Sequence, residues 1–345
     1  MNARGDSSAS CCIERDEAVT KPRILVVTTG GTIASRWDAT ARALRSVADG
    51  DELLASLGAC APDFEVTLDD FVNLGSNLID LETAFRLARH IEARLHDDAV
   101  VGCVVAHGTD TLEESAFLTS LVVASEKPVA FTGAQRGADA PDADGPGNLA
   151  DAMRVAASPE AVGLGTVVVF DGAVLGARDA TKVHASRAAA FASPGVGPLG
   201  MVDRGELIVT HRPTRVPSFP TRSIETRVDL IALAMGADAR LFDAAVESGA
   251  RGVVLEAFGR GNATPAIVEA VARARATGVT TIVASRCPEG RVLPLYGDGG
   301  GRDLEEAGAI FAGGLRGPKA RILLCLALAN VARERRPDLF RAFGR

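Results

Sequence analysis

Aromatic side chains are scarce in this chain of 345 residues: they make up 4% of it, with one Trp and one Tyr. Ala, Val and Leu must therefore supply most of the packing. No apolar stretch approaches the ~20 residues of a membrane-spanning helix, so no membrane partner is expected. Lys and Arg form no run, and the formal net charge is −7, which argues against a nucleic-acid partner because phosphate binding needs a clustered basic face.

Motifs that bind metals or nucleotides are also missing. The six cysteines form no CxxC pair or zinc spacing, and the five histidines form no HExxH. The phosphate-binding motif GK[ST] does not occur, and Gly259–Thr264 lacks the third glycine of a dinucleotide loop. The GxSxG elbow that carries a serine nucleophile is absent as well. We therefore expect neither a metal nor a cofactor. Cys103 and Cys325 lie in apolar runs and are expected to be reduced; with a polar first twenty residues that contain no apolar signal segment, this favours a cytoplasmic location.

The hydrophobic pattern indicates strands alternating with helices. Short apolar runs predict buried strands, and apolar residues at three- and four-residue steps predict helices. Such alternation is typical of parallel sheets covered on both faces. The expected strands span residues 23–28, 65–68, 100–106, 129–132, 165–170, 228–233, 252–255 and 279–284, and the expected helices include 81–95, 148–157, 241–248, 265–276 and 318–333.

Composition also divides the chain. Residues 211–226 are rich in Pro, Arg, Ser and Thr, as interdomain linkers often are. We therefore expect a flexible tail at 1–21, an N-terminal catalytic α/β domain at 22–210, this linker, and a C-terminal α/β domain at 227–345. The polar segment 35–51 is expected to be a mobile loop, and such a loop beside a site can act as a lid.

Two segments carry most of the chemistry, TTGGTIAS (28–35) and HGTDTLEE (107–114). Each follows an expected strand, and in open α/β sheets ligands bind at the carboxyl ends of parallel strands. The hydroxyls of Thr32 and Thr109 and the carboxylate of Asp110 are thus offered to one crevice. This predicts threonine-based chemistry on a small polar substrate.

Purely structural readings of these segments remain open. Two glycines before Thr32 could serve only for positive φ or for close backbone approach. Asp110 with Glu113, or Thr111 with Glu114, could form a capping box for the following helix. A buried Asp110 would need a cation or hydrogen-bond donors to stay ionised, and Lys182 can supply a cation.

Taken together, the segments resemble the bacterial-type L-asparaginase and glutaminase-asparaginase family over nearly the whole chain from Arg23 onward. The resemblance implies a larger flavodoxin-like N-terminal domain and a smaller Rossmann-like C-terminal domain, each with three layers around a parallel sheet. It implies hydrolysis of the side-chain amide of L-asparagine to L-aspartate and ammonia. The matching motifs are TTGGTIAS (28–35), NLGSN (73–77), HGTDTLEE (107–114), FTGAQR with ADGPGNL (131–149), RDATK (178–182), GPLG (197–200), GRGN (259–262) and GPKARILL (317–324).

The resemblance also implies catalytic roles. Thr32 is the primary nucleophile and forms an acyl-enzyme that water then hydrolyses. Thr109, Asp110 and Lys182 form a second constellation, in which Lys182 is a base or proton relay held by Asp110. A threonine hydroxyl is a weak nucleophile that needs such a base.

Substrate-binding roles follow in the same way. Ser76 and Asp110 bind the α-carboxylate and α-amino groups, with Asn77 next to Ser76. The backbone amides of Ala134 and Thr109 are oxyanion donors. Family members are usually dimers of dimers whose sites are closed by a neighbour, which implies a homodimer or homotetramer with sites at the subunit interface.

Three positions concern that neighbour. Asn262 lies where a neighbour-supplied polar residue is expected, although it could equally be a turn residue beside Gly261. The neighbour's usual glutamate has no clear counterpart, and Asp298 and Asp303 are the candidates.

One departure concerns the lid, which normally carries a tyrosine. The only tyrosine here, Tyr296, is far from the equivalent stretch Ala43–Ser46. The absence of this phenol supports one alternative, a non-catalytic amino-acid sensor on the same fold. Two further alternatives are a glutaminase-asparaginase of broad specificity, because the motifs do not distinguish the two substrates, and the amidase subunit of a tRNA-dependent amidotransferase, which shares this core.

Overall fold

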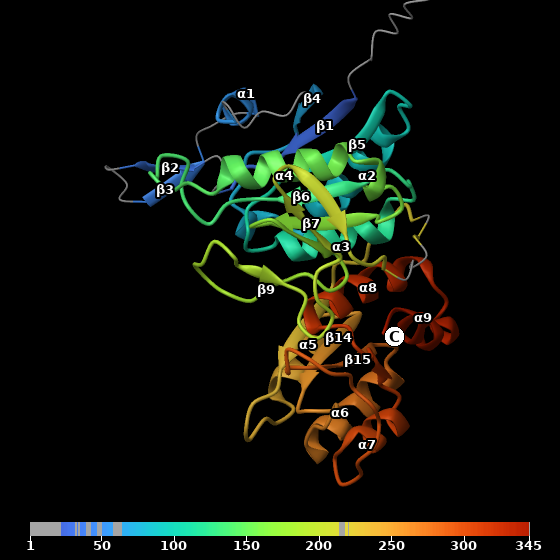
Figure 1. The fold of residues 1–345 in the computed structure, drawn as a ribbon. Helices are drawn as coiled ribbons and strands as arrows, with labels where there is room; N and C mark the ends of the chain where they lie inside the picture. The colour runs from blue at the N-terminus through green and yellow to red at the C-terminus, as the bar shows by residue number, and fades with distance from the viewer. Residues whose placement is uncertain are drawn as a thin grey trace, which may run out of the picture.

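Two sheets organise the described chain, which comprises residues 22–31, 33, 35–38, 43–46, 50–57, 64–213, 218–219 and 221–344 of a computed structural model. Only the backbone is described for 35–38, 43–46 and 50. The larger sheet lies in the upper domain of Figure 1 and the smaller one in the lower domain. Thr32 and the expected tail 1–21 lie outside the described residues.

The larger sheet has eight strands in the described part of the chain, in the order β12-β11-β8-β7-β6-β5-β1-β4. Its strands are β1 (Arg23–Thr28), β4 (Glu65–Asp70), β5 (Val100–Ala106), β6 (Val129–Thr132), β7 (Thr166–Phe170), β8 (Ala173–Gly176), β11 (Gly200–Asp203) and β12 (Glu206–Val209). The neighbours from β4 to β7 pair in parallel, whereas β8, β11 and β12 add an antiparallel edge. The parallel sheet expected from the sequence is present, and the antiparallel edge is an addition to it.

The five parallel strands follow the flavodoxin order. Numbered along the chain, β4-β1-β5-β6-β7 reads 2-1-3-4-5. The chain therefore leaves β1 and β5 in opposite directions across the sheet, which opens a crevice at their carboxyl ends. The two threonine motifs follow β1 and β5, so the topology directs both of them to this switch point.

Helices cover both faces of this sheet because its strands alternate apolar side chains between the faces. Ile24 and Val26 of β1 pack in the cluster that contains α4 (Gly145–Ala157). Leu25 and Val27 pack in the cluster that contains α2 (Leu81–Leu95) and α3 (Leu112–Val122). Both faces are thus buried, as expected for parallel strands.

Helix α2 illustrates how local sequence sets an element. Asp80 is its N-cap and accepts a hydrogen bond of 2.8 Å from the Thr83 amide, which lowers the pKa of the Asp80 carboxyl. The helix buries an apolar stripe at three- and four-residue steps, as the sequence predicts, partly in the cluster that covers the sheet and partly in the cluster shared with α3 and α8 (Gly317–Asn330). The buried stripe consists of Ala84, Phe85, Leu87, Ala88, Ile91 and Leu95.

Short elements of the upper domain lie outside its sheet. The expected mobile loop 35–51 contains an antiparallel hairpin of β2 (Ser35–Asp38) and β3 (Ala43–Ser46), followed by the start of α1 (Gly50–Ala55). A second small pair joins β9 (Thr181–Lys182) to β10 (Phe191–Ala192). Single 3-10 turns include η3 (Ser76–Leu78) and η4 (Pro159–Ala161).

The lower domain repeats the α/β plan on a smaller scale. Its four described strands are all parallel, in the order β13-β14-β15-β16. They are β13 (Val228–Ala232), β14 (Gly252–Ala257), β15 (Thr280–Ser285) and β16 (Ile310–Phe311). The helices are α5 (Arg240–Glu247), α6 (Pro265–Ala276), α7 (Gly301–Glu306), α8 (Gly317–Asn330) and α9 (Arg336–Phe343), with a 3-10 turn η5 (Arg333–Arg335). Together with the upper sheet, this confirms the predicted two-domain α/β class.

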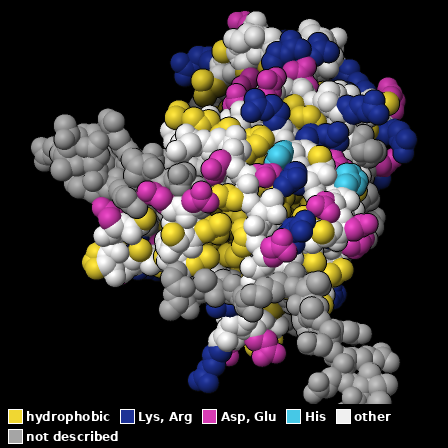
Figure 2. Space-filling view, turned by 90° about the horizontal axis from the view of Figure 1, so that it is seen from above, with side chains coloured by type: hydrophobic (Ala, Val, Ile, Leu, Met, Phe, Trp, Pro, Cys, Tyr) yellow, Lys and Arg dark blue, Asp and Glu magenta, His cyan; other side chains and the backbone are white. Residues whose placement is uncertain are grey.

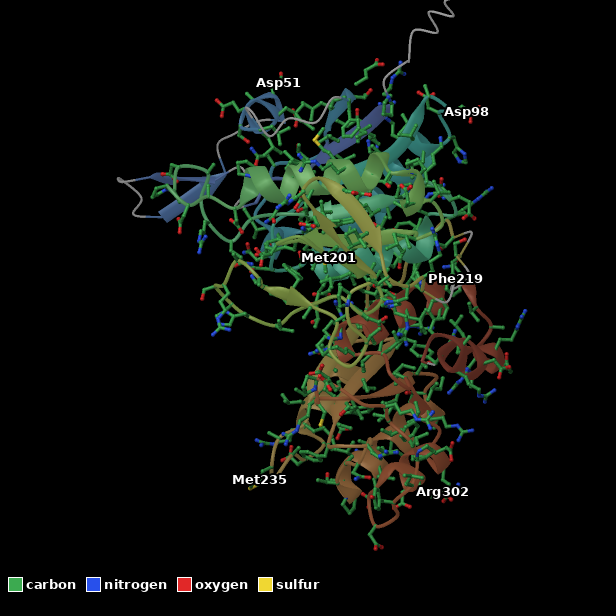
Figure 3. The ribbon with its side chains drawn as sticks, viewed as in Figure 1. Asp51, Asp98, Met201, Phe219, Met235 and Arg302 are labelled. Atoms are coloured by element: carbon green, nitrogen blue, oxygen red, sulfur yellow. The ribbon has the colours of Figure 1, made fainter. Side chains whose placement is uncertain are left out.

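The two domains meet through an apolar contact. Phe117 and Leu121 of α3 share a cluster with Leu323 and other residues of α8. Phe219, labelled in Figure 3 where the domains join, stacks on Phe343 with ring centroids 5.9 Å apart. The C-terminal domain is therefore packed directly against the helix that follows the second threonine motif.

The surface gives two further findings. Within the described ranges, no helix is both long enough and apolar enough to cross a bilayer. On the face seen in Figure 2, Lys and Arg side chains are interspersed with Asp and Glu rather than gathered into a basic stripe.

Candidate active site

The two threonine motifs meet backbone to backbone. Gly30 and Gly31 both have φ of +92°, and a Cβ on Gly31 would lie 2.4 Å from the Gly108 Cα. A Cβ on Gly108 would in turn lie 2.7 Å from the Ser76 hydroxyl oxygen. Real Cβ atoms do not approach other atoms so closely, so only glycine allows this contact. The residues before Thr32 and Thr109 therefore touch, and Ser76 lies against them.

The expected cost of a side chain at this contact is large. We expect Gly31→Ala to lower the free energy of unfolding by about 2 kcal/mol or more, because strain at positive φ adds to a backbone clash. Urea unfolding followed by circular dichroism measures this change. Gly147→Ala is the matched control, because nothing lies within 4 Å of a Cβ there. Equal stability of the two variants would contradict the proposed steric need.

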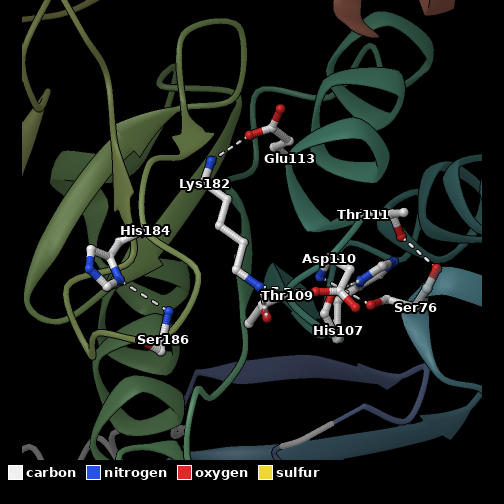
Figure 4. Close-up of polar contacts among 10 residues, drawn as sticks. Ser76, His107, Thr109, Asp110, Thr111, Glu113, Lys182, His184 and Ser186 are labelled. Carbon is white, nitrogen blue, oxygen red and sulfur yellow. Dashed lines mark hydrogen bonds and ion pairs between the residues drawn. The ribbon is translucent and has the colours of Figure 1, made fainter.

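A lysine joins the second threonine to its aspartate. The Lys182 ammonium donates a hydrogen bond of 2.9 Å to the Thr109 hydroxyl and one of 3.0 Å to an Asp110 carboxylate oxygen (Figure 4). Thr109 is 6% exposed, whereas the side chain of Asp110 is 64% exposed. The cluster thus has a buried hydroxyl at its base and an accessible carboxylate at its rim.

Ser76 fixes the backbone next to this cluster. The Asp110 amide donates to the Ser76 hydroxyl at 3.1 Å, and the Thr111 hydroxyl donates to the Ser76 carbonyl at 2.8 Å. Ser76 is buried and Asn77 is exposed on the same η3 turn. Of the binding residues suggested by the family resemblance, Ser76 thus lies at the cluster, and Asn77 lies beside it at the surface.

The capping-box interpretation is wrong. Thr111 is the N-cap of α3 but makes no side-chain capping bond, because its hydroxyl is bonded to Ser76. Glu113 instead accepts a hydrogen bond of 2.5 Å from the Lys182 backbone amide. Both side chains have partners that are distant in sequence, which a local spacing rule does not consider.

The Ala134 loop is held by residues to which the sequence analysis assigned no role. Asp144 accepts hydrogen bonds from the backbone amides of Gln135 and Arg136 at 3.0 Å each, and Asn148 donates to the Gly133 carbonyl at 3.0 Å. Their signal in the sequence was the ADGPGNL motif, quoted for the resemblance alone.

These contacts bring Ala134 towards the second motif. A Cβ on Gly133 would lie 2.4 Å from the His107 carbonyl and 3.3 Å from the Thr109 methyl carbon. Within the described part of the chain, neither the Thr109 amide nor the Ala134 amide donates to another group. Backbone amides of two buried residues that have no other acceptor are suited to stabilising an oxyanion.

His107 is fully buried beneath the site. Its Nδ1 lies 2.7 Å from the Gly108 carbonyl, to which it can only donate, and its Nε2 has no partner among the described residues. Burial lowers the pKa of His107 to about 4, although the Gly108 contact opposes this shift. A neutral imidazole is therefore expected throughout the physiological range.

This shift has a consequence for stability at acid pH. Between about pH 6.5 and 4 the unfolded chain binds a proton at His107 that the folded chain does not, so stability falls as pH falls. The contribution lost is about 3 kcal/mol at most, from the size of the pKa difference. We expect His107→Asn to unfold at urea midpoints that depend less on pH between 7 and 5. His96→Gln is the matched control, because it removes a solvent-exposed histidine that lies outside the site. A wild-type slope in His107→Asn would contradict this assignment.

Sequence comparisons identify the family to which this arrangement belongs. The profile described as "Asparaginase, N-terminal" matches residues 23–215, and that described as "Glutaminase/Asparaginase C-terminal domain" matches residues 227–339. The chain belongs to the asparaginase family. This confirms the resemblance inferred from the motifs.

Individual relatives agree with the profiles. L-asparaginase 2 of Bacillus subtilis is 35% identical over 333 residues, which cover 94% of this chain and 86% of the relative. A probable L-asparaginase of Deinococcus radiodurans is 38% identical over 332 residues, covering 93% and 97%. The crystal structure of a probable cytoplasmic L-asparaginase from Campylobacter jejuni superposes with a TM-score of 0.83 at 30% identity, covering 93% of this chain and 100% of that one.

The remaining candidates in this asparaginase-family chain lie in the C-terminal domain. Asn262 exchanges backbone hydrogen bonds with Phe258, and its side-chain oxygen accepts from the Gly301 amide at 3.2 Å. Asp303 accepts from the Gly299 amide at 2.7 Å and so closes a local turn, whereas Asp298 is exposed with φ of +56°. The contacts of Asn262 and Asp303 are within their own domain and not with the threonine cluster.

Proposed function

We propose that the chain hydrolyses the side-chain amide of L-asparagine to L-aspartate and ammonia through an acyl-enzyme on Thr32. The observation that carries the proposal is the Lys182 ammonium bridging the Thr109 hydroxyl and the Asp110 carboxylate at the switch point of the sheet. The names of the relatives, L-asparaginase in Bacillus subtilis and probable L-asparaginase in Deinococcus radiodurans, support the substrate.

In the first half-reaction the Thr32 oxygen attacks the amide carbon of the substrate. The hydroxyl proton passes to the base, which we assign to Lys182. The amides of Thr109 and Ala134 stabilise the oxyanion, typically by about 3 kcal/mol for one such donor. The nitrogen then takes up a proton and leaves as ammonia. An ester between Thr32 and the aspartyl group remains.

In the second half-reaction water attacks this ester and restores the Thr32 hydroxyl as aspartate leaves. Lys182 serves as base in its neutral amine form, or as a proton relay that gives one proton to Asp110 as it accepts another. Its Nζ lies 2.9 Å from the Thr109 hydroxyl and 3.0 Å from an Asp110 carboxylate oxygen, within reach for both transfers. Asp110 holds Lys182 through one oxygen and offers its exposed carboxylate to the α-amino group. Ser76 and Asn77 bind the α-carboxylate.

Ammonia release tests the proposal. The purified chain is assayed with L-asparagine, L-glutamine and the D-form of each, and binding is measured in parallel by calorimetry. Turnover of L-asparagine above all others is the expected result. Comparable turnover of L-glutamine would make the chain a glutaminase-asparaginase, since one methylene is worth only about 1–3 kcal/mol in a pocket. Binding of L-asparagine without ammonia release would overturn the proposal in favour of a sensor.

A homodimer or homotetramer with shared sites is the companion proposal. The C-terminal domain carries large apolar side chains that face solvent in one copy, among them Met235 at 99% exposure and Leu241 at 70%. Met235 projects from the lower end of the molecule in Figure 3. Side chains of this kind are available for burial against a second copy. Asn262 lies in this domain and is a candidate to complete a neighbour's site; light scattering of the purified chain gives the subunit count.

A cytoplasmic location is proposed from the cysteines. Cys103 and Cys325 are buried free thiols, and burial raises the pKa of Cys325 to about 12, which keeps it protonated. Free thiols suit a reducing compartment. Relatives include a probable periplasmic L-asparaginase of Haemophilus influenzae, so cell fractionation is the test.

A further inference from the structure

A fully buried lysine of the C-terminal domain contacts the segment that leads to Lys182. Lys319, in the first turn of α8, is 1% exposed. Its ammonium donates hydrogen bonds to three backbone carbonyls, those of Ala177 at 2.8 Å, Arg178 at 3.0 Å and Ala180. An ammonium has three N–H donors and a neutral amine has two, so this environment matches the charged form.

A buried ammonium is costly unless its donors are satisfied, and here three acceptors come from one short segment. Burial lowers the pKa of Lys319 to about 8. The charges of Glu113 and Asp179 oppose this shift, whereas Arg316 and Arg178 add to it. The segment 177–180 thus gains a fixed point in the other domain, two residues before Lys182.

The Lys182 backbone is held from a second side as well. Its amide donates to the Glu113 carboxylate at 2.5 Å, and Glu113 lies in the first turn of α3. Glu113 is also near enough to Lys319 to influence its titration. Helix α3 of the N-terminal domain and helix α8 of the C-terminal domain therefore both form hydrogen bonds with the backbone at or next to Lys182.

We propose that Lys319 and Glu113 are positioning residues that hold segment 177–182 so that the Lys182 amine reaches Thr109 and Asp110. This rests on the proposed role of Lys182 in amide hydrolysis. The Lys182 side chain is long and flexible, and its end is placed only if its backbone is fixed. Misplacement of a catalytic group by about 1 Å can cost about 10²-fold in rate. The C-terminal domain would then influence the rate of amide hydrolysis through the position of Lys182.

The test compares Lys319→Met with a matched control. Lys319→Met keeps an unbranched side chain and removes the three donors. Arg336→Met is the control, because the Arg336 contacts, to Val331 and Thr280, stay inside the C-terminal domain. For Lys319→Met we expect kcat for L-asparagine to fall about 10²-fold while KM changes less than about threefold. Arg336→Met should lose thermal stability with kcat unchanged.

Either of two results in folded protein would overturn the proposal: a Lys319→Met kcat within about threefold of wild type, or equal losses of kcat in both variants. Lys319→Arg covers the case in which Lys319→Met does not fold. Arg keeps the positive charge and has N–H donors, but these donors lie in one plane on three nitrogens. They cannot reproduce the three hydrogen bonds that the single Lys319 nitrogen makes. We expect it to fold with kcat lowered about tenfold, and an unchanged kcat with segment 177–180 displaced would overturn the proposal.

A crystal structure separates this proposal from the proposed function. In the two Lys319 variants the distance from Lys182 Nζ to Thr109 Oγ1, 2.9 Å in the wild type, should lengthen by about 1 Å or more. This readout holds even if the wild-type chain releases no ammonia, which would refute the proposed function alone. An unchanged distance in Lys319→Met would refute the positioning role alone.

Discussion

Replacing Thr32 with Ala is expected to abolish ammonia release from L-asparagine and to leave the fold intact. Alanine has no hydroxyl, so no acyl-enzyme can form, and loss of a catalytic nucleophile typically costs more than about 10⁴-fold in kcat. The residues on either side have contacts of their own. Gly31 touches Gly108, and Ile33 is buried in the cluster that contains Ala134.

Two companion variants make the Thr32 experiment decisive. Thr32→Ser keeps a hydroxyl and should retain measurable turnover. Thr109→Val removes the other hydroxyl of the site, the one bonded to Lys182, and tests which of the two carries the acyl group. Mass spectrometry after rapid quenching should find an aspartyl adduct on residue 32. If Thr32→Ala keeps most of its activity, Thr32 is not the nucleophile.

Lys182→Met is expected to lower kcat by about 10²–10⁴-fold, the range for loss of a general base or acid. Methionine has a similar length and no proton to exchange. The fold should survive because the Asp110 side chain is 64% exposed and water can solvate its carboxylate once the lysine is gone. Steady-state kinetics at several pH values and thermal unfolding are the measurements.

Lys127→Met is the control for this second variant. Lys127 also holds backbone carbonyls, those of Leu95 and Asp97 at the end of α2, but it contacts neither threonine motif. Its substitution should alter stability and leave kcat near the wild-type value. Undiminished turnover in Lys182→Met would remove Lys182 from the mechanism.

Much of the fold could be predicted from the sequence because its central strands are continuous apolar runs. Strands β1, β5, β6 and β7 are almost wholly buried, so composition alone marks them. Strands β11 and β12 have four residues each, with most of them at least partly exposed, and they pair as a hairpin at the sheet edge. These segments are short and combine apolar with charged residues, so they give a weaker signal than the long buried runs, and the antiparallel edge was not predicted.

Only those site residues that belong to recognisable motifs could be predicted from the sequence. The resemblance suggested that Thr109, Asp110 and Lys182 act together, and their side chains do meet. The local spacing rule predicted a capping role for Glu113 that the structure does not show. Its carboxylate instead accepts a hydrogen bond from the backbone amide of Lys182, which is 69 residues away. Lys319 received no role from the sequence beyond its place in the GPKARILL motif, because its contacts depend on how two domains pack. Such tertiary contacts leave no periodic trace in one sequence.

The contact between Gly31 and Gly108 also limits how the specificity of this protein can be redesigned. Because two main chains abut there, no exchange of a side chain can make room between the loops that follow β1 and β5, and an atom added at either glycine would clash with the other loop. Room for a longer substrate must be sought elsewhere. The exposed Asn77 on η3 is a described position at the site where a side chain can change size without adding an atom to that contact.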